Sequence, residues 1–210
     1  MSINMEQIKN LREMTGAGIA DCKKALSESE GSIDKAVDYL RKKGLATAAK
    51  KANRAAKEGQ ITSYIHGAGN IGVLVEINCE TDFVARTDDF QALCKDVAMH
   101  IAAAAPSHVK REEVPNEWVE REKEVVATQA KNSGKPEQFI EKIITGRMDK
   151  FFAETCLLEQ SFVKDPEVTI NELLQQSIAK MGENITIARF SRFVLGETAK
   201  PQTEEEEQES

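Results

Sequence analysis

In this chain of 210 residues, aromatic residues are scarce, and long apolar runs and a signal-like start are lacking. Aromatic side chains make up 5% of it, with a single tryptophan, so Ala, Ile, Leu and Val must supply most of the core. No segment approaches the about 18 consecutive apolar residues of a membrane span. The opening MSINMEQIKN has neither the basic start nor the apolar stretch of a signal peptide. We therefore expect no membrane contact and a cytoplasmic location, or an organelle stroma for an organelle form.

Motifs for metal, cofactor or covalent chemistry are also lacking. The four cysteines form no C-x-x-C pair and the three histidines show no ligand spacing: Cys22, Cys79, Cys94, Cys156, His66, His100 and His108. Gly67–Gly72 matches G-x-G-x-x-G by letter, but a strand pattern follows where a nucleotide site needs a helix. Neither a P-loop nor a G-x-S-x-G elbow occurs. We therefore expect no metal, no cofactor and no catalytic residue, hence a protein that is not an enzyme.

Acidic residues outnumber basic ones, 35 to 28, which gives a net charge of −7. Five of the acids lie among the last eight residues, so the rest of the chain is almost balanced. The acidity therefore belongs to residues 197–210, a Pro-, Glu- and Gln-rich tail that we expect to be disordered. Because the chain has no basic excess, we expect no direct binding to nucleic acid.

Three short amphipathic patterns in residues 1–54 predict a small three-helix domain. Apolar residues recur three and four positions apart in Met5–Met14, in Ile19–Glu28 and in a segment that follows Ser32. Gly16 and Gly18 mark the first turn, and Ser32 is a favoured residue for a helix N-cap.

A basic, alanine-rich stretch, Arg41–Lys57, follows these patterns. It lacks large apolar residues, so we interpret it as a partly helical linker with a positive face. That face is either solvated or a docking surface for an acidic partner, in which case Lys50, Lys51 and Arg54 are the candidate docking residues.

The composition then becomes that of an α+β core, residues 55–196. β-Branched residues flank a Gly/Asn turn in Ile61–Asn78 and predict a β-hairpin, with Val73, Val75, Ile77 and Cys79 on one face. The later elements are expected to be a helix capped by Asp88 or Asp89, helices over 116–131 and 136–156 with a break between them, a turn at Asp165-Pro166, a helix over 170–181 and a strand over 185–194.

Asn78–Arg86 leaves two interpretations open. In the first, Phe83 and Val84 fold inward onto the core and Asp82 caps a helix. In the second, a strand–helix turn presents Asp82, Phe83 and Arg86 outward, and an aromatic residue flanked by charges is typical of an interface hot spot.

Two segments together resemble one protein family. Thr15–Leu26 reads TGAGIADCKKAL, and Asn78–Arg86 reads NCETDFVAR. They are similar to the TGAGxxDCKKAL and NCxTDFVAR signatures of translation elongation factor Ts, and they occur in the family's order. The resemblance covers residues 2–196 and leaves only the acidic tail outside.

The resemblance implies an α+β fold with two parts. The N-terminal three helices resemble ubiquitin-associated modules, and the core is a small antiparallel sheet packed with helices that also mediates dimerisation. The chain is too short for the two core subdomains and coiled-coil hairpin of the long members. It therefore resembles the short class, which implies a homodimer and a complex of two chains with two partner molecules.

The resemblance also implies guanine-nucleotide exchange on elongation factor Tu, in its GDP-bound and nucleotide-free forms, during protein biosynthesis. Asp82 and Phe83 are implied to enter the partner's GTPase domain near its magnesium site and promote GDP release. The implied exchange residues are Thr81, Asp82, Phe83, Val84 and Arg86. The implied contacts of the N-terminal domain are Thr15, Gly16, Gly18, Ile19, Asp21 and Cys22.

Two alternatives from other functional classes remain. The three-helix module alone is consistent with a ubiquitin-binding adaptor. The basic stretch Arg41–Lys57 alone is consistent with a ribosome- or RNA-associated protein, whose binding would weaken steeply with salt.

Overall fold

The computed structural model describes residues 4–132 and 137–198. Most of the predicted break before residue 137 and most of the acidic tail lie outside the described residues. Within them, the chain forms eight α-helices, a three-stranded antiparallel sheet and a two-stranded one, which confirms the α+β prediction. No helix in these ranges is both long and apolar enough to cross a bilayer.

The three predicted N-terminal helices are present as α1 (Met5–Thr15), α2 (Ile19–Glu28) and α3 (Ile33–Lys51). Ser32 caps α3 as predicted, since its side chain accepts from the backbone N–H of Lys35. These helices enclose a small core of their own, composed of Ile8, Leu11, Cys22, Ala25, Leu26 and Ala36. The likeness of this module to ubiquitin-associated domains stays a prediction.

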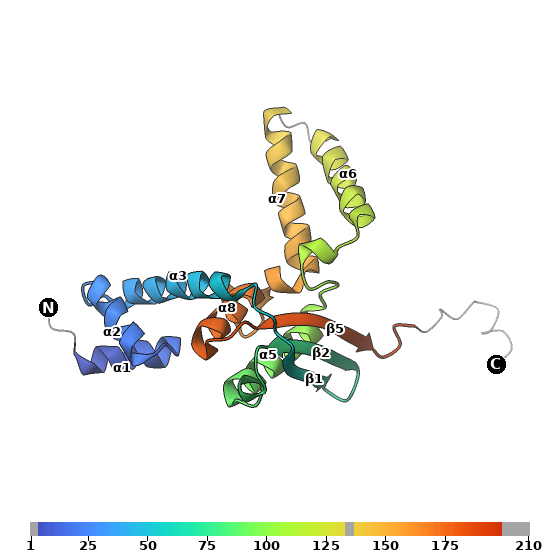
Figure 1. Cartoon of the computed structure of the whole chain (residues 1–210). Coiled ribbons are helices and arrows are strands. Elements are labelled where there is room, and N and C mark those ends of the chain that lie inside the picture. The colour runs from blue at the N-terminus through green and yellow to red at the C-terminus, as the bar shows by residue number, and fades with distance from the viewer. Residues whose placement is uncertain (1–3, 133–136, 199–210) are drawn as a thin grey trace.

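The basic stretch is different from the expected linker over most of its length. α3 continues unbroken through Arg41 to Lys51, and it lies along α8 (Ile170–Met181) of the core (Figure 1). Small residues allow this close approach: a Cβ added at Gly44 would lie 3.5 Å from the Cβ of Ala179. Ala48 is buried in the main core, so this part of the stretch is a packed helix and not a linker.

The main sheet has the strand order β1 (Glu58–His66), β2 (Ile71–Cys79) and β5 (Thr186–Val194). Its inner face carries the predicted stripe Val73, Val75, Ile77 and Cys79, each at most 2% exposed. Helix α5 (Asp88–Ala104) covers this face. Its N-cap is Thr87, whose hydroxyl accepts from the N–H of Phe90, so the prediction of Asp88 or Asp89 as the cap is wrong.

The outer face of the same sheet is apolar and open. Its exposed large apolar side chains are Ile61, Ile65, Leu74 and Phe193, which are 48–65% accessible to solvent, and Ser63, Ser191 and the pair Glu76–Arg189 share the face. No element among the described residues buries them, so this side of the sheet is a free surface of the single chain.

Two antiparallel helices, α6 (Asn116–Asn132) and α7 (Glu137–Thr155), project from the body as an arm (Figure 1). The predicted helices over 116–131 and 136–156 are thus confirmed, and they pair as a helical hairpin although the chain was expected to be too short for the two core subdomains and coiled-coil hairpin of the long members. Arg111, in the 3₁₀ turn η1 (Arg111–Glu113), fixes the base of the arm. Its guanidinium binds Glu159 and Asp149 and stacks over the Phe152 ring at 4.4 Å.

Short elements connect the arm to α8. They are η2 (Leu157–Glu159), β3 (Ser161–Phe162) and β4 (Asp165–Thr169), with β3 and β4 paired antiparallel. The predicted turn at Asp165-Pro166 is displaced, because the turn lies at Val163-Lys164 and Asp165 begins β4.

A buried histidine of α5 predicts a pH dependence of stability. The His100 ring is fully buried; its Nε2 lies 3.0 Å from Gln160 Oε1, and its Nδ1 lies 3.3 Å from the backbone N–H of Val163. Both contacts are satisfied by a neutral ring, and burial lowers the His100 pKa. In the unfolded chain His100 takes up a proton near pH 6.5, whereas in the folded chain it stays neutral to a lower pH. Stability should therefore fall as the pH drops from about 7.5 to 5.5.

Urea unfolding at both pH values measures this effect. The shift in midpoint should shrink in His100→Gln and persist in His66→Gln, a control at an exposed histidine. An equal shift in both variants would assign the pH dependence to other groups.

Candidate functional site

A one-turn helix, α4 (Asp82–Ala85), follows directly after β2 and carries the segment singled out in the sequence. Its N-cap is Thr81, whose hydroxyl accepts from the N–H of Val84 at 3.4 Å. Asp82 is the first helical residue, so the interpretation of Asp82 as the cap is wrong.

The two apolar residues of α4 point to different environments. Phe83 is 81% exposed, the most exposed large hydrophobic side chain among the described residues. Val84 is half-buried and packs against the main core. The outward interpretation therefore holds for Phe83, and the inward one holds for Val84.

Charged groups flank the exposed ring. The Asp82 carboxylate and the Arg86 guanidinium form an ion pair of 2.8 Å across one helical turn, and both side chains remain accessible. The site thus presents an uncovered aromatic ring next to a carboxylate and a cation, on a strand–helix turn of the core.

The start of α4 is tied to a distant turn of the chain, a feature that the sequence did not indicate. The Glu80 carboxylate accepts from the backbone N–H of Asn184 at 2.7 Å, and this bond lowers the Glu80 pKa. The buried Asn184 amide donates to the backbone oxygens of Arg54 at 2.8 Å and Ala52 at 3.4 Å. Three chain segments therefore meet beside α4.

Two of the three candidate docking cations take part in this junction. Lys51 donates to the backbone oxygen of Gly182, and Arg54 pairs with Glu80 at 3.5 Å. Lys50, the third candidate, is exposed to solvent and takes no part in these two contacts. Lys51 and Arg54 therefore join the end of α3 to the core, and the assignment of these cations as docking residues stays a prediction.

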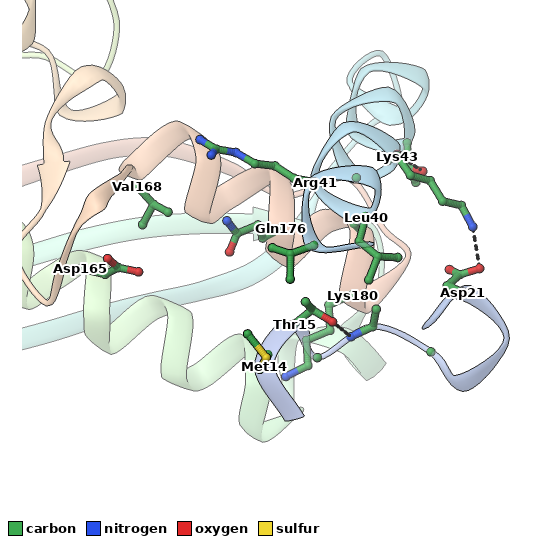
Figure 2. Close-up of a pocket in the computed structure, with 17 residues that line it drawn as sticks. Met14, Thr15, Asp21, Leu40, Arg41, Lys43, Asp165, Val168, Gln176 and Lys180 are labelled. Atoms are coloured by element: carbon green, nitrogen blue, oxygen red, sulfur yellow. Dashed lines mark hydrogen bonds and ion pairs between the residues drawn. The ribbon is translucent and has the colours of Figure 1, made fainter. Parts of the chain in front are cut away.

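The turn between α1 and α2 forms a second candidate site. Thr15, Gly16, Gly18 and Asp21 line a groove of about 440 Å³, whose other side is formed by residues of α3, β4 and α8 (Figure 2). Gly16 has a φ of 66°, a left-handed conformation that favours glycine and ends α1. Thr15 fixes the turn, because its hydroxyl donates to the Leu11 oxygen at 2.6 Å and accepts from the Ala17 N–H.

The remaining N-terminal candidates differ in accessibility. Ile19 is 54% exposed, and Asp21 binds Lys43 at 2.5 Å (Figure 2). Cys22 is fully buried, and burial raises its thiol pKa, so it supports the turn from inside and offers no surface contact. This corrects the expectation that Cys22 is a contact residue.

Residues with metal-binding or nucleophilic side chains also occur in the rest of the described chain. No three His, Cys, Asp or Glu side chains gather there as metal ligands. All four cysteines are free and buried, and burial raises the pKa of Cys94 and of Cys156 to about 11. A thiol with so high a pKa is a poor nucleophile at neutral pH.

Comparison with known proteins gives one consistent result. The family model described as Elongation factor TS matches residues 6–197. Elongation factor Ts of Geobacter sulfurreducens is 62% identical over 197 residues, covering 94% of this chain and 91% of the relative. Elongation factor Ts of Geobacter metallireducens is 60% identical, covering 97% and 95%. That of Heliobacterium modesticaldum is 58% identical, covering 93% and 91%.

The exposure of Phe83 predicts that truncating it will hardly affect folding. Phe83→Ala should leave the free energy of unfolding nearly unchanged, because its ring is mostly in water already. Phe90→Ala is the matched control at a fully buried ring and should cost about 3–5 kcal/mol. Thermal or urea unfolding of both variants measures the difference. Similar losses in the two would mean that Phe83 is part of the core.

Proposed function

This chain belongs to the elongation factor Ts family, and we propose that it promotes GDP release from elongation factor Tu as a guanine-nucleotide exchange factor in translation elongation. The observation that carries this proposal is the exposed Phe83 ring on a well-anchored turn, within the segment that resembles the family's TDFV signature.

Exchange of this kind needs binding and no covalent chemistry. A protein that binds the nucleotide-free partner more tightly than the GDP-bound one weakens GDP binding by the same factor, because coupled binding free energies are reciprocal. The described residues suit this role, since they present surfaces and no metal cluster or activated nucleophile.

Phe83 is the group proposed to separate elements of the partner near its magnesium site. Burying one Phe side chain yields about 1.5–3 kcal/mol, and each 1.36 kcal/mol off a barrier is worth about tenfold in rate. The ring can therefore contribute roughly ten- to a hundredfold in GDP release. Asp82 would compete beside it for the partner's cationic and hydrogen-bond donors, with Thr81 and Val84 holding the helix and Arg86 pairing with Asp82.

The N-terminal module is proposed to contact the same GTPase domain. Ile19 supplies exposed apolar area, and the turn Thr15–Gly18 is rigid enough to form a defined surface. In this proposal residues 1–54 are the partner-binding module, residues 55–196 are the exchange and dimerisation core, and Lys50 assists electrostatic docking.

The open face of the sheet supports the proposal of a homodimer. Ile65 and Phe193 flank Gly72 across the three strands, and Leu74 lies next to them. The one charge pair on this face, Glu76 with Arg189 at 2.7 Å, is internally neutralised, and that bond lowers the Glu76 pKa. A second copy can cover such a face about a two-fold axis, because the surface is apolar and carries no net charge. Two chains would then bind two partner molecules.

Phe83→Ala should slow exchange while the protein stays folded. We expect GDP release from elongation factor Tu to fall roughly ten- to a hundredfold, as estimated from one buried ring. Release of a fluorescent GDP analogue in stopped flow measures it. Phe139→Ala, at an exposed ring of the arm, is the matched control and should be unchanged. Undiminished release with Phe83→Ala would assign the opening of the partner to another residue.

The sheet face predicts a dimer that one charge can break. Phe193→Glu should halve the mass in light scattering at micromolar concentration, because two carboxylates would be buried at the two-fold contact. Phe139→Glu places the same charge on an exposed ring of the arm and should remain dimeric. A wild-type monomer, or a dimer that survives Phe193→Glu, would exclude this interface.

A further inference from the structure

The helix that presents Phe83 has little packing of its own, since only the partly buried Val84 and Ala85 rest on the main core. α4 has four residues and no buried residue, and a single helical turn is unstable in isolation because nucleation costs more than one hydrogen bond returns. Groups outside the helix must therefore help to set the direction in which the exposed ring points.

Glu183, from the turn between α8 and β5, is one such group. One of its carboxylate oxygens accepts from the backbone N–H groups of Glu80 at 3.1 Å and Thr81 at 3.0 Å. The other accepts from the Thr81 hydroxyl at 2.6 Å. Three donors at the start of α4 thus converge on one side chain more than a hundred residues away in the chain.

The turn that carries Glu183 is itself held in place. The backbone oxygen of the neighbouring Gly182 accepts a hydrogen bond from Lys51. The other neighbour, Asn184, donates its backbone N–H to Glu80 and its side-chain amide to the backbone oxygens of Arg54 and Ala52. The link between Glu183 and α4 is therefore reciprocal, because Glu80 binds the turn that Glu183 belongs to. This arrangement leaves α4 little freedom to tilt.

We propose that Glu183 is a positioning residue for nucleotide exchange, which fixes the orientation of α4 so that Asp82 and Phe83 meet the partner in a single geometry. The proposal rests on the exchange function proposed above. Glu183 acts through Phe83 and itself makes no contact with the partner, so its effect should exist only while the Phe83 ring is present.

Three substitutions separate geometry from charge. Glu183→Ala removes both acceptor oxygens, and with them all three hydrogen bonds, and should slow GDP release about tenfold. Glu183→Gln keeps the reach, since its amide oxygen can accept the two N–H groups and its NH₂ can donate to Thr81, so it should retain most of the wild-type rate. Glu183→Asp keeps the charge but is one methylene too short and should be intermediate.

Glu113→Ala is the matched control for general destabilisation. The Glu113 carboxylate also accepts a backbone N–H, that of Val109 at 3.0 Å, but it lies at the base of the arm. The substitution Glu113→Ala should lower the midpoint of urea unfolding without slowing GDP release. Amide hydrogen exchange gives a readout without the partner: the Glu80 and Thr81 amides should lose protection in Glu183→Ala and keep it in Glu113→Ala.

A double-mutant cycle with Phe83→Ala decides the mechanism. In the Phe83→Ala background, adding Glu183→Ala should slow release by less than twofold, because the group that it positions is gone. A further tenfold loss there, retained amide protection, or normal exchange in Glu183→Ala would each overturn the role of Glu183 alone. Failure of the wild-type chain to accelerate GDP release would instead overturn the proposed function, and this inference with it.

Discussion

The turn Gly182–Asn184 is the point on which the arrangement of the candidate site depends. It receives the end of α3 through Lys51, the backbone before β1 through the Asn184 side chain, and the start of α4 through Glu80 and Glu183. The bonds of Lys51, Glu80 and Glu183 to backbone are charge-assisted, and bonds of this kind are among the stronger hydrogen bonds in proteins. These bonds fix the positions of the N-terminal module, the sheet and the exposed Phe83 relative to one another.

The scarcity of aromatic residues makes their placement informative. Eight phenylalanines serve the whole chain, and the main core is filled largely by aliphatic side chains around Phe90. Leaving Phe83 and Phe193 mostly in water is unfavourable for a lone chain. Both are held on rigid elements, one on the anchored turn of α4 and the other on the strand β5. Exposed rings fixed in this way are the kind of group that protein interfaces use as anchors.

The groove between the α1–α2 turn and α8 shows how the two parts of the chain are combined. Contact between them runs mainly along α3 and α8, where glycine and alanine let the helices approach closely. Toward α1 and α2 the two parts diverge and leave the groove lined by Thr15, Gly16 and Lys180 (Figure 2). The signature residues of the module therefore face a hollow beside the core, while Cys22 and Ala25 of the same segment build the module's interior.

The helices, the hairpin, the inner stripe of β2 and the location of the candidate segments could all be predicted from the sequence, because periodicity, caps and turn residues act within a few positions. Some predictions from the sequence were wrong. Asp88 or Asp89 was predicted as the cap of α5, where Thr87 is the cap, and a linker was predicted where α3 packs on α8. Long-range packing settles that Phe83 is exposed while Val84 is half-buried against the core, that Lys51 and Arg54 are joined to the core, and that Glu183 holds α4. Those facts depend on residues far apart in the chain that meet only when α8 and β5 close over the junction.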